Sequence, residues 1–259
     1  MKIGLALSGG GALGAAHIGV LEELEKNHIK IDEISGTSAG AIMAAIYASG
    51  GLKALDAFFD EVTKIAFFNQ KRPFDLITPV KFYDKIFEIF KGYCKGSIED
   101  MPIKLLVAAT NIGTGKRRVF KSGNTVKAVR ASSAYPGVFP MQTIDGQLYV
   151  DGGITCTLPA ELIRETSDFV IGSELYGITQ IPSEKIKKIN RALLLVRTLD
   201  ILQMQLSAEF SKQCDFCFRM NPETLKWYSF NKMVEIRERG RVQARDQIKE
   251  LLKRLDSQG

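Results

Sequence analysis

The chain of 259 residues has few residues of the kinds that build metal or disulfide sites: two histidines, four cysteines and one tryptophan. Two histidines are too few for a histidine-rich zinc site. Four cysteines in a chain of this length do not make a disulfide scaffold. Cys214 and Cys217 form a C-x-x-C, but no second Cys or His pair lies near them in the sequence. We interpret them as buried thiols at the start of a strand and predict no metal and no cofactor.

Long hydrophobic runs are also lacking. No run approaches the roughly 20 apolar residues of a membrane span, and the apolar stretch before Gly9 is too short for a signal-peptide core. The net charge is +6, and the basic runs KIKK and GKRR are short and separate, unlike the basic blocks that bind nucleic acid. We expect a cytoplasmic protein that binds no nucleic acid. Its mild positive charge leaves open a peripheral contact with an anionic membrane surface.

The first fifty residues alternate between strands, glycine loops and helices. The strand KIGLALS is followed by the loop SGGGALG and a helix over 14–26, and the strand IDEIS is followed by GTSAG and a small-residue helix. We expect that second helix to end at Gly50 and Gly51. This order is typical of a parallel α/β sheet.

The later chain adds further predicted elements and no linker, so we expect a single domain over 1–259. The motifs lie in a core over about 1–200, and a mainly helical extension follows over about 200–259. The expected elements are a buried strand at 103–111, a hairpin partner at 117–124, a helix at 125–135 that stops at Pro136, paired strands at 141–153, a helix-like stretch at 159–166, a strand at 168–175, and a long helix, a short strand and a last helix after residue 190.

Residues 53–93 interrupt this order with a concentration of aromatic residues. We interpret the stretch as a helical insertion that packs its rings into the core. The alternative is a lid or acyl-chain wall that also rests on a membrane surface. The aromatic residues concerned are Phe58, Phe59, Phe67, Phe68, Phe74, Phe82, Tyr83, Phe87, Phe90 and Tyr93.

The loop LSGGGALG has two interpretations. Taken as G-x-G-x-x-G, it would hold the phosphates of a dinucleotide. Alternatively, Gly9, Gly10 and Gly11 would direct backbone N–H groups at the oxyanion of an acyl-transfer reaction. A dinucleotide site needs an acidic residue at the end of the second strand, but Asp32 and Glu33 lie at its start and GTSAG occupies its end. We therefore interpret the loop as an oxyanion hole.

GTSAG lies between a predicted strand and a predicted helix, the context of a nucleophile elbow. Its tight turn would present the Ser38 side chain, and Gly36 and Gly40 would avoid Cβ clashes with the neighbouring strand and helix. The N–H of Ala39, at a helix N-terminus, would favour developing negative charge. The alternative is an N-cap serine that only opens the helix.

A nucleophilic serine needs a base. His17 and His28 both precede Ser38, and we expect His17 to pack beside the first helix and His28 to be exposed. A carboxylate must then serve. Asp151 follows a strand and precedes Gly152 and Gly153, and the carboxyl ends of strands are where α/β sheets build their sites. The alternative is a turn aspartate that bonds its own backbone.

The motifs LSGGGALG, GTSAG, AVRASSAYPGVFP and DGG, in this order, resemble those of the patatin-like phospholipases over roughly residues 1–200. The resemblance implies a three-layer α/β/α sandwich with a mostly parallel sheet, and Ser38 and Asp151 as nucleophile and base. It assigns Gly9, Gly10 and Gly11 to the oxyanion loop. The segment after residue 200 resembles the C-terminal helices of bacterial members but carries no diagnostic motif.

One residue departs from the family pattern. Leu13 stands where family loops commonly have Arg or Lys, which bears on phosphate-headgroup recognition more than on ester cleavage because the backbone donors are unchanged.

The resemblance implies a serine acyl hydrolase acting on lipid esters, of phospholipase A or lysophospholipase type, through an acyl-enzyme. A thioesterase or transacylase could use the same dyad. A non-catalytic acyl-binding or nucleotide-binding module that uses the glycine loop is the alternative from a different class.

Overall fold

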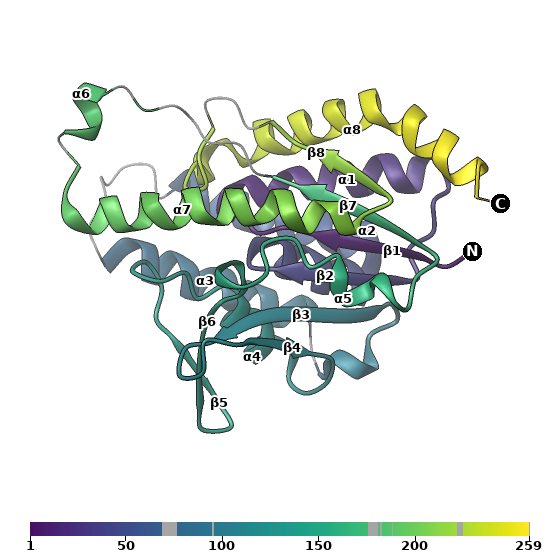
Figure 1. Ribbon diagram of the computed structural model, residues 1–259. Coiled ribbons are helices and arrows are strands. Elements are labelled where there is room, and N and C mark those ends of the chain that lie inside the picture. Colours follow the sequence, from purple (N-terminus) through teal and green to yellow (C-terminus); the bar gives the residue numbers. More distant parts are fainter. Residues whose placement is uncertain are drawn as a thin grey trace.

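The computed structural model describes residues 1–68, 77–94, 96–175, 181, 183–187, 189–221 and 225–258. Its centre is an eight-stranded sheet in the order β5-β6-β3-β2-β1-β7-β8, with β4 paired to β3 (Figure 1). The neighbouring strands β3, β2, β1, β7 and β8 pair in parallel. The pairs β3–β4, β3–β6 and β5–β6 are antiparallel. The mostly parallel sheet predicted from the sequence is confirmed. The strands are β1 (Ile3–Leu7), β2 (Glu33–Thr37), β3 (Lys104–Asn111), β4 (Arg117–Phe120), β5 (Gln142–Ile144), β6 (Gln147–Asp151), β7 (Phe169–Glu174) and β8 (Phe216–Arg219).

Helices connect these strands and cover the sheet. They are α1 (Ala15–Lys26), α2 (Ala39–Phe68), α3 (Ile77–Tyr93), α4 (Thr125–Ser132), α5 (Glu161–Arg164), α6 (Ser183–Ile186), α7 (Arg191–Phe210) and α8 (Met233–Asp256). Short 3₁₀ helices occur at η1 (Gly11–Gly14), η3 (Ile98–Asp100), η4 (Gly152–Ile154), η5 (Ser211–Gln213) and η6 (Phe230–Lys232). Two of these, η1 and η4, belong to the glycine loop and to the DGG motif.

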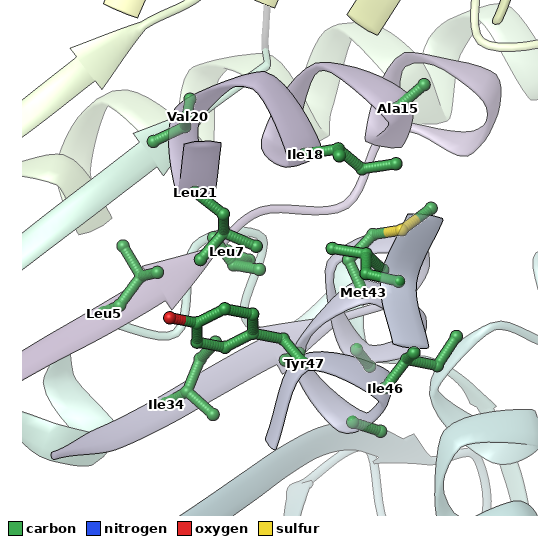
Figure 2. Close-up of a cluster of buried hydrophobic side chains, with 14 of the residues drawn as sticks. Leu5, Leu7, Ala15, Ile18, Val20, Leu21, Ile34, Met43, Ile46 and Tyr47 are labelled. Atoms are coloured by element: carbon green, nitrogen blue, oxygen red, sulfur yellow. The ribbon is translucent and has the colours of Figure 1, made fainter. Parts of the chain in front are cut away.

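The central strands bury both faces, as expected of a parallel sheet covered by helices. Alternate side chains of each strand enter different clusters. On one face Leu5, Leu7 and Ile34 pack against α1 and α2 (Figure 2). On the other, Ala6, Leu106 and Val170 pack against the segment around α5. These two clusters make the three-layer α/β/α sandwich. Cys214 and Cys217 are partly buried free thiols at the edge of the second cluster, next to the start of β8.

The last helix packs on the first. Figure 1 shows α8 alongside α1, and the two come into backbone contact at Gly19 and Gly240. A Cβ on Gly19 would lie 2.3 Å from the backbone N of Arg241, and one on Gly240 would lie 2.4 Å from the carbonyl O of Ala16. Only hydrogen at both positions allows this crossing. The C-terminal extension is thus part of the packing around the glycine loop.

One predicted helix end is confirmed and another is wrong. The small-residue helix ends at Gly50 and Gly51, where the backbone angles are not helical and Gly51 has φ +64°, and a second helical segment under the same label α2 continues to Phe68. Helix α4 ends at Ser132 instead of reaching Pro136. The residue before a proline disfavours the helical region, and the carbonyl of Ala134 accepts a hydrogen bond from the N–H of Asp151, which ties this segment to β6 instead.

The described aromatic rings of 53–93 lie in the core. Phe58 and Phe59 on α2 and Phe82, Phe87 and Phe90 on α3 are buried, which supports the interpretation as a core-packing insertion. The side chains of Phe67 and Phe68, and the whole of Phe74, lie outside what the structure describes. Tyr93 is half-buried, and the other described rings of the stretch are buried.

Among the described residues, one helical stretch, Ala39–Ala66 in α2, has the length and mean hydropathy of a membrane span, which the sequence reading did not anticipate. Half of its most apolar window is buried within the protein, and a helix of a protein core meets the same criteria. The kink at Gly50 and Gly51 also divides it.

Candidate active site

The strand pairing explains how the GTSAG and DGG motifs come together. On β3, Val107 and Ala108 pair with both β2 and β4, while Ala109 and Thr110 pair with both β4 and β6. Because a strand has only two edges, β2 and β6 share the edge opposite β4. Thr37, the last residue of β2, faces Ala108, and Asp151, the last residue of β6, faces Ala109. The two strands therefore end against each other.

Ser38 occupies the turn between β2 and α2 with φ +55°, a left-handed conformation that is costly for a residue other than glycine. Its N–H donates to Ser132 Oγ at 2.8 Å, which fixes the turn to α4. A Cβ on Gly40 would lie 2.3 Å from the carbonyl O of Leu7 and 2.5 Å from that of Ser8. The start of α2 therefore presses directly on the end of β1, as the elbow interpretation requires.

Ser38 and Asp151 are hydrogen-bonded. Ser38 Oγ donates to Asp151 Oδ2 at 2.6 Å, and the N–H of Gly153 donates to Asp151 Oδ1 at 2.7 Å. The carboxylate is 1% exposed. Burial raises the pKa of Asp151 to about 7, while the hydrogen bonds from Ser38 and Gly153 act to lower it. The carboxylate is therefore a stronger base than an exposed aspartate, and it contacts the hydroxyl that it would deprotonate.

Two of the three consecutive glycines in the glycine loop have N–H groups that no described residue accepts. Within the described residues, the N–H groups of Gly10, Gly11 and Ala39 have no acceptor. The N–H of Gly9, by contrast, donates to the carbonyl O of Thr157 at 3.1 Å. We correct the expected donor set accordingly and omit Gly9. Ala12, the next residue, is fixed by a bond from its N–H to the carbonyl O of Trp227 at 2.6 Å.

His17 lies under the glycine loop and is fully buried, not a base for Ser38. Its Nε2 lies 2.9 Å from the carbonyl O of Ser8 and its Nδ1 lies 2.8 Å from Ser173 Oγ. Burial lowers the pKa of His17 to about 4, although the bond to Ser8 acts to raise it. The ring is therefore neutral at pH 7, with Nε2–H donating to Ser8 and Nδ1 accepting from Ser173.

Leu13, the departure from the family loop, is buried. It lines a small cavity of about 20 Å³ with Leu175, Leu225 and Ile236. A basic side chain at this position would lose its hydration, and no described acidic residue lines the cavity to pair with its charge. The C-terminal extension thus explains why an apolar residue fits this position.

The acidic residues that a dinucleotide site would use lie at the amino-terminal end of β2, away from the glycine loop. Asp32 Oδ2 accepts from the N–H of Ile3 at the start of β1, and Glu33 is bonded to Lys104, Thr166 and Ser167. The glycine loop follows the opposite end of β1. Asp32 and Glu33 therefore lie at the wrong end of the strands to bind a ribose next to the glycine loop.

Helix α7 covers the DGG motif, a feature that the sequence did not reveal. A Cβ on Gly153 would lie 2.7 Å from Gln203 Nε2. Asp200 Oδ1 accepts from the hydroxyl of Tyr135 at 2.8 Å, and the Tyr135 ring stacks on Trp227 with centroids 5.8 Å apart. Tyr135 and Ser132 lie in the AVRASSAYPGVFP segment, so the sequence motif could have indicated that they are near the site. Gln203 and Trp227 lie in no such motif, and the sequence alone could not have placed them there.

The chain is similar to several known proteins. It is 33% identical over 178 residues to an NTE family protein of Mycobacterium bovis, covering 68% of this chain and 49% of that protein. It is 29% identical to a patatin-like phospholipase domain-containing protein of Caenorhabditis elegans, covering 96% of this chain and 21% of that protein. It is 32% identical to Lysophospholipase NTE1 of Mycosarcoma maydis, covering 63% of this chain and 9% of that protein. The chain therefore spans about half or less of the length of these relatives.

The fold and the sequence pattern point to the same relationship. VipD from Legionella pneumophila matches the fold with a TM-score of 0.53 at 14% identity, covering 99% of this chain and 67% of that chain. The family model for patatin-like phospholipase matches residues 5–163, a span that includes the glycine loop, Ser38 and Asp151. The chain belongs to the patatin-like phospholipase family.

Proposed function

We propose that the protein is a serine hydrolase that cleaves carboxylic ester bonds of lipids, with Ser38 as nucleophile and Asp151 as base. The observation that carries the proposal is the 2.6 Å hydrogen bond from Ser38 Oγ to a buried carboxylate. Family membership and relatives named as lysophospholipases support a lipid ester substrate of the phospholipase A or lysophospholipase type.

In the first step Ser38 Oγ attacks the ester carbonyl carbon and its proton passes to Asp151 Oδ2. The negative charge that develops on the carbonyl oxygen needs preorganised donors. The N–H groups of Gly10, Gly11 and Ala39 supply them, because they have no acceptor among the described residues. One such donor commonly contributes about 3 kcal/mol to the transition state. Collapse of the intermediate breaks the bond to the alcohol, which leaves with the proton from Asp151.

In the second step water cleaves the acyl-enzyme. Asp151, again ionised, accepts a proton from the attacking water, and Ser38 recovers its proton as the acid leaves. The same carboxylate therefore serves as base and acid in turn. Its pKa of about 7 suits both roles near neutral pH, because a group that transfers protons in both directions works best when its pKa is close to the pH.

A fluorophosphonate ester probe tests this function. We expect a covalent adduct on the peptide that contains Ser38, identified by mass, and no adduct in Ser38→Ala. The Asp151→Asn variant should label far more slowly. Absence of labelling in the folded wild type, with detergent present, would contradict the proposal and favour an acyl-binding module without catalysis.

Matched controls come from exposed positions. Asp145→Asn makes the same chemical change in the β5–β6 turn, where Asp145 has φ +50°, a conformation that asparagine also tolerates. Ser122→Ala removes an exposed hydroxyl. Both variants should label at the wild-type rate. Product analysis with a phospholipid, a lysophospholipid and an acyl thioester then separates hydrolase, thioesterase and transacylase activities.

A further inference from the structure

Helix α7 exposes six large apolar side chains and turns the polar side chains of Asp200, Gln203 and Ser207 inward. Leu195 is 68% exposed, whereas Gln203 is 6% exposed and Ser207 is fully buried. Asp200, Gln203 and Ser207 recur at helical spacing and form the inner stripe. The exposed large hydrophobic residues of α7 are Leu193, Leu194, Leu195, Ile201, Leu202 and Leu206. This arrangement is the reverse of a surface helix that faces only water.

The outward face is mainly apolar from Leu194 to Leu206, although the exposed side chains of Thr198 and Gln205 lie on the same side. Leu194 and Ile201 are seven residues apart, as are Leu195 and Leu202, and Leu206 follows Leu202 by one turn. These five side chains therefore lie on one side of the helix, which runs along the outside of the molecule (Figure 1). Grouped exposed apolar side chains of this kind mark a surface that binds another apolar phase. We refer to these five residues as the leucine face.

The charge next to the leucine face indicates which apolar phase. The sequence from 183 to 197 has five basic residues, Lys185, Lys187, Lys188, Arg191 and Arg197, and one acidic residue, Glu184. Apolar residues beside Lys and Arg are the pattern of helices that lie in the interface of an anionic bilayer. A basic residue near such a surface adds to binding until salt screens it.

The position of α7 connects this surface to the dyad. Gln203, on the inner stripe, packs on Gly153, and Gly153 donates to Asp151. Asp200 is bonded to Tyr135 on the segment that leads to β5. A helix is about 10 Å in diameter. The leucine face is therefore about one helix diameter from the DGG motif.

We propose that the leucine face of α7 docks the protein on an anionic lipid surface, with Lys187, Arg191 and Arg197 at the headgroups. The proposal rests on the proposed function, since it brings Ser38 to the interface that contains its ester substrate. It assigns the membrane contact to α7 instead of to the aromatic stretch 53–93, whose described rings are buried apart from the half-buried Tyr93.

The test compares vesicle binding of the full chain and of the triple variant Leu194→Gln, Leu195→Gln, Leu202→Gln. Vesicles are made of phosphatidylcholine with and without phosphatidylglycerol, and binding is measured by co-sedimentation. We expect the wild type to bind the anionic vesicles and the triple variant to bind them roughly tenfold or more weakly, because three apolar side chains no longer enter the lipid. Lys187→Gln with Arg191→Gln should weaken binding to the anionic vesicles and reduce its dependence on salt.

Val234→Gln with Val242→Gln is the matched control, because both valines are exposed on α8, away from α7. It should bind vesicles like the wild type. Equal binding by the wild type and the triple variant would overturn the proposal, and so would absence of binding by the wild type. Loss of self-association without loss of vesicle binding, measured by analytical ultracentrifugation, would also overturn it and assign the face to a second copy of the chain.

Labelling of Ser38 and hydrolysis of a soluble short-chain ester, measured without vesicles, keep the two proposals separate. If the triple variant retains both but loses vesicle binding, docking and hydrolysis are both supported. If wild-type vesicle binding is normal but Ser38 is not labelled, the proposed function fails while docking stands. If Ser38 is labelled but no vesicle binds, docking fails alone.

Discussion

His17 Nε2 lies 2.9 Å from the carbonyl oxygen of Ser8, two residues before Gly10. The neutral ring thus donates to the carbonyl of Ser8, just before the first glycine of the loop. Its other nitrogen, Nδ1, accepts from the hydroxyl of Ser173. Since Gly10 and Gly11 are the proposed oxyanion donors, we expect His17 to be a positioning residue that acts on the reaction through the loop.

The variant His17→Leu should lower kcat on a soluble ester about tenfold with little change in KM, because the donors lose their alignment. It should also lower the free energy of unfolding by about 2 kcal/mol, since Ser8 and Ser173 lose a buried partner. His17→Gln, which keeps a donor, should recover part of the rate. Steady-state kinetics and chemical denaturation measure both. A rate that is unchanged in His17→Leu would show that the loop needs no such support.

The pH dependence of kcat/KM should report the ionisation of Asp151. The base must be unprotonated to accept the Ser38 proton, so the rate should rise with pH and level off above about pH 7. Initial rates on a soluble ester between pH 4 and pH 9 measure this. A rate already at its maximum at pH 5 would contradict the assignment.

Asp151→Asn should stabilise the fold above neutral pH. The pKa of Asp151 is raised in the folded protein, so the folded state holds a proton that the unfolded state has released between about pH 4 and pH 7. Stability therefore falls as pH rises through this range. The variant has no such penalty, which is of the order of 4 kcal/mol above pH 7. Its advantage in Tm over the wild type should be absent near pH 4 and largest near pH 8, with Asp145→Asn as control.

Ser38→Ala and Asp151→Asn should each lower kcat by roughly 10³-fold, and the double variant should be little slower than either one. Groups that act as one unit lose their effect together, because neither contributes without the other. Single-turnover rates with a chromogenic ester measure all three variants. Losses that multiply in the double variant would show that the two side chains act independently.

Gly40→Ala should destabilise the protein by roughly 2 kcal/mol or more, because the added methyl group would meet the backbone carbonyls of Leu7 and Ser8. Gly92→Ala in α3 is the control, since a Cβ there meets no atom within 4 Å. Alanine has the higher helix propensity, so the control should gain a few tenths of a kcal/mol, up to about 1. Thermal unfolding of both variants measures the contrast.

The sequence was sufficient for the strands and for the choice of Ser38 and Asp151, because these depend on local signals. Apolar runs mark buried strands, GTSAG has the right neighbours, and the lack of a late histidine leaves a carboxylate as the candidate base. The close approach of the two residues was not a local signal. It depends on β2 and β6 sharing one edge of β3, which only the register shows.

Other features needed tertiary contacts to decide them. Gly9, Gly10 and Gly11 look equivalent in the sequence, but Thr157 takes the N–H of Gly9 alone. Helix α7 is rich in leucine on several sides, so its periodicity did not show which side faces the protein. The inward face is the polar one, which a rule that buries apolar residues would have assigned to solvent.

The bond from Ala12 to Trp227 sets an order in time. A ribosome delivers the glycine loop first, Ser38 soon after and then Asp151, but Trp227, which fixes Ala12, follows much later. A growing chain that has passed residue 151 already contains both Ser38 and Asp151, yet its loop lacks the Trp227 carbonyl until that residue emerges. The part of the site that is synthesised first therefore gains this hydrogen bond only after residue 227 has been added.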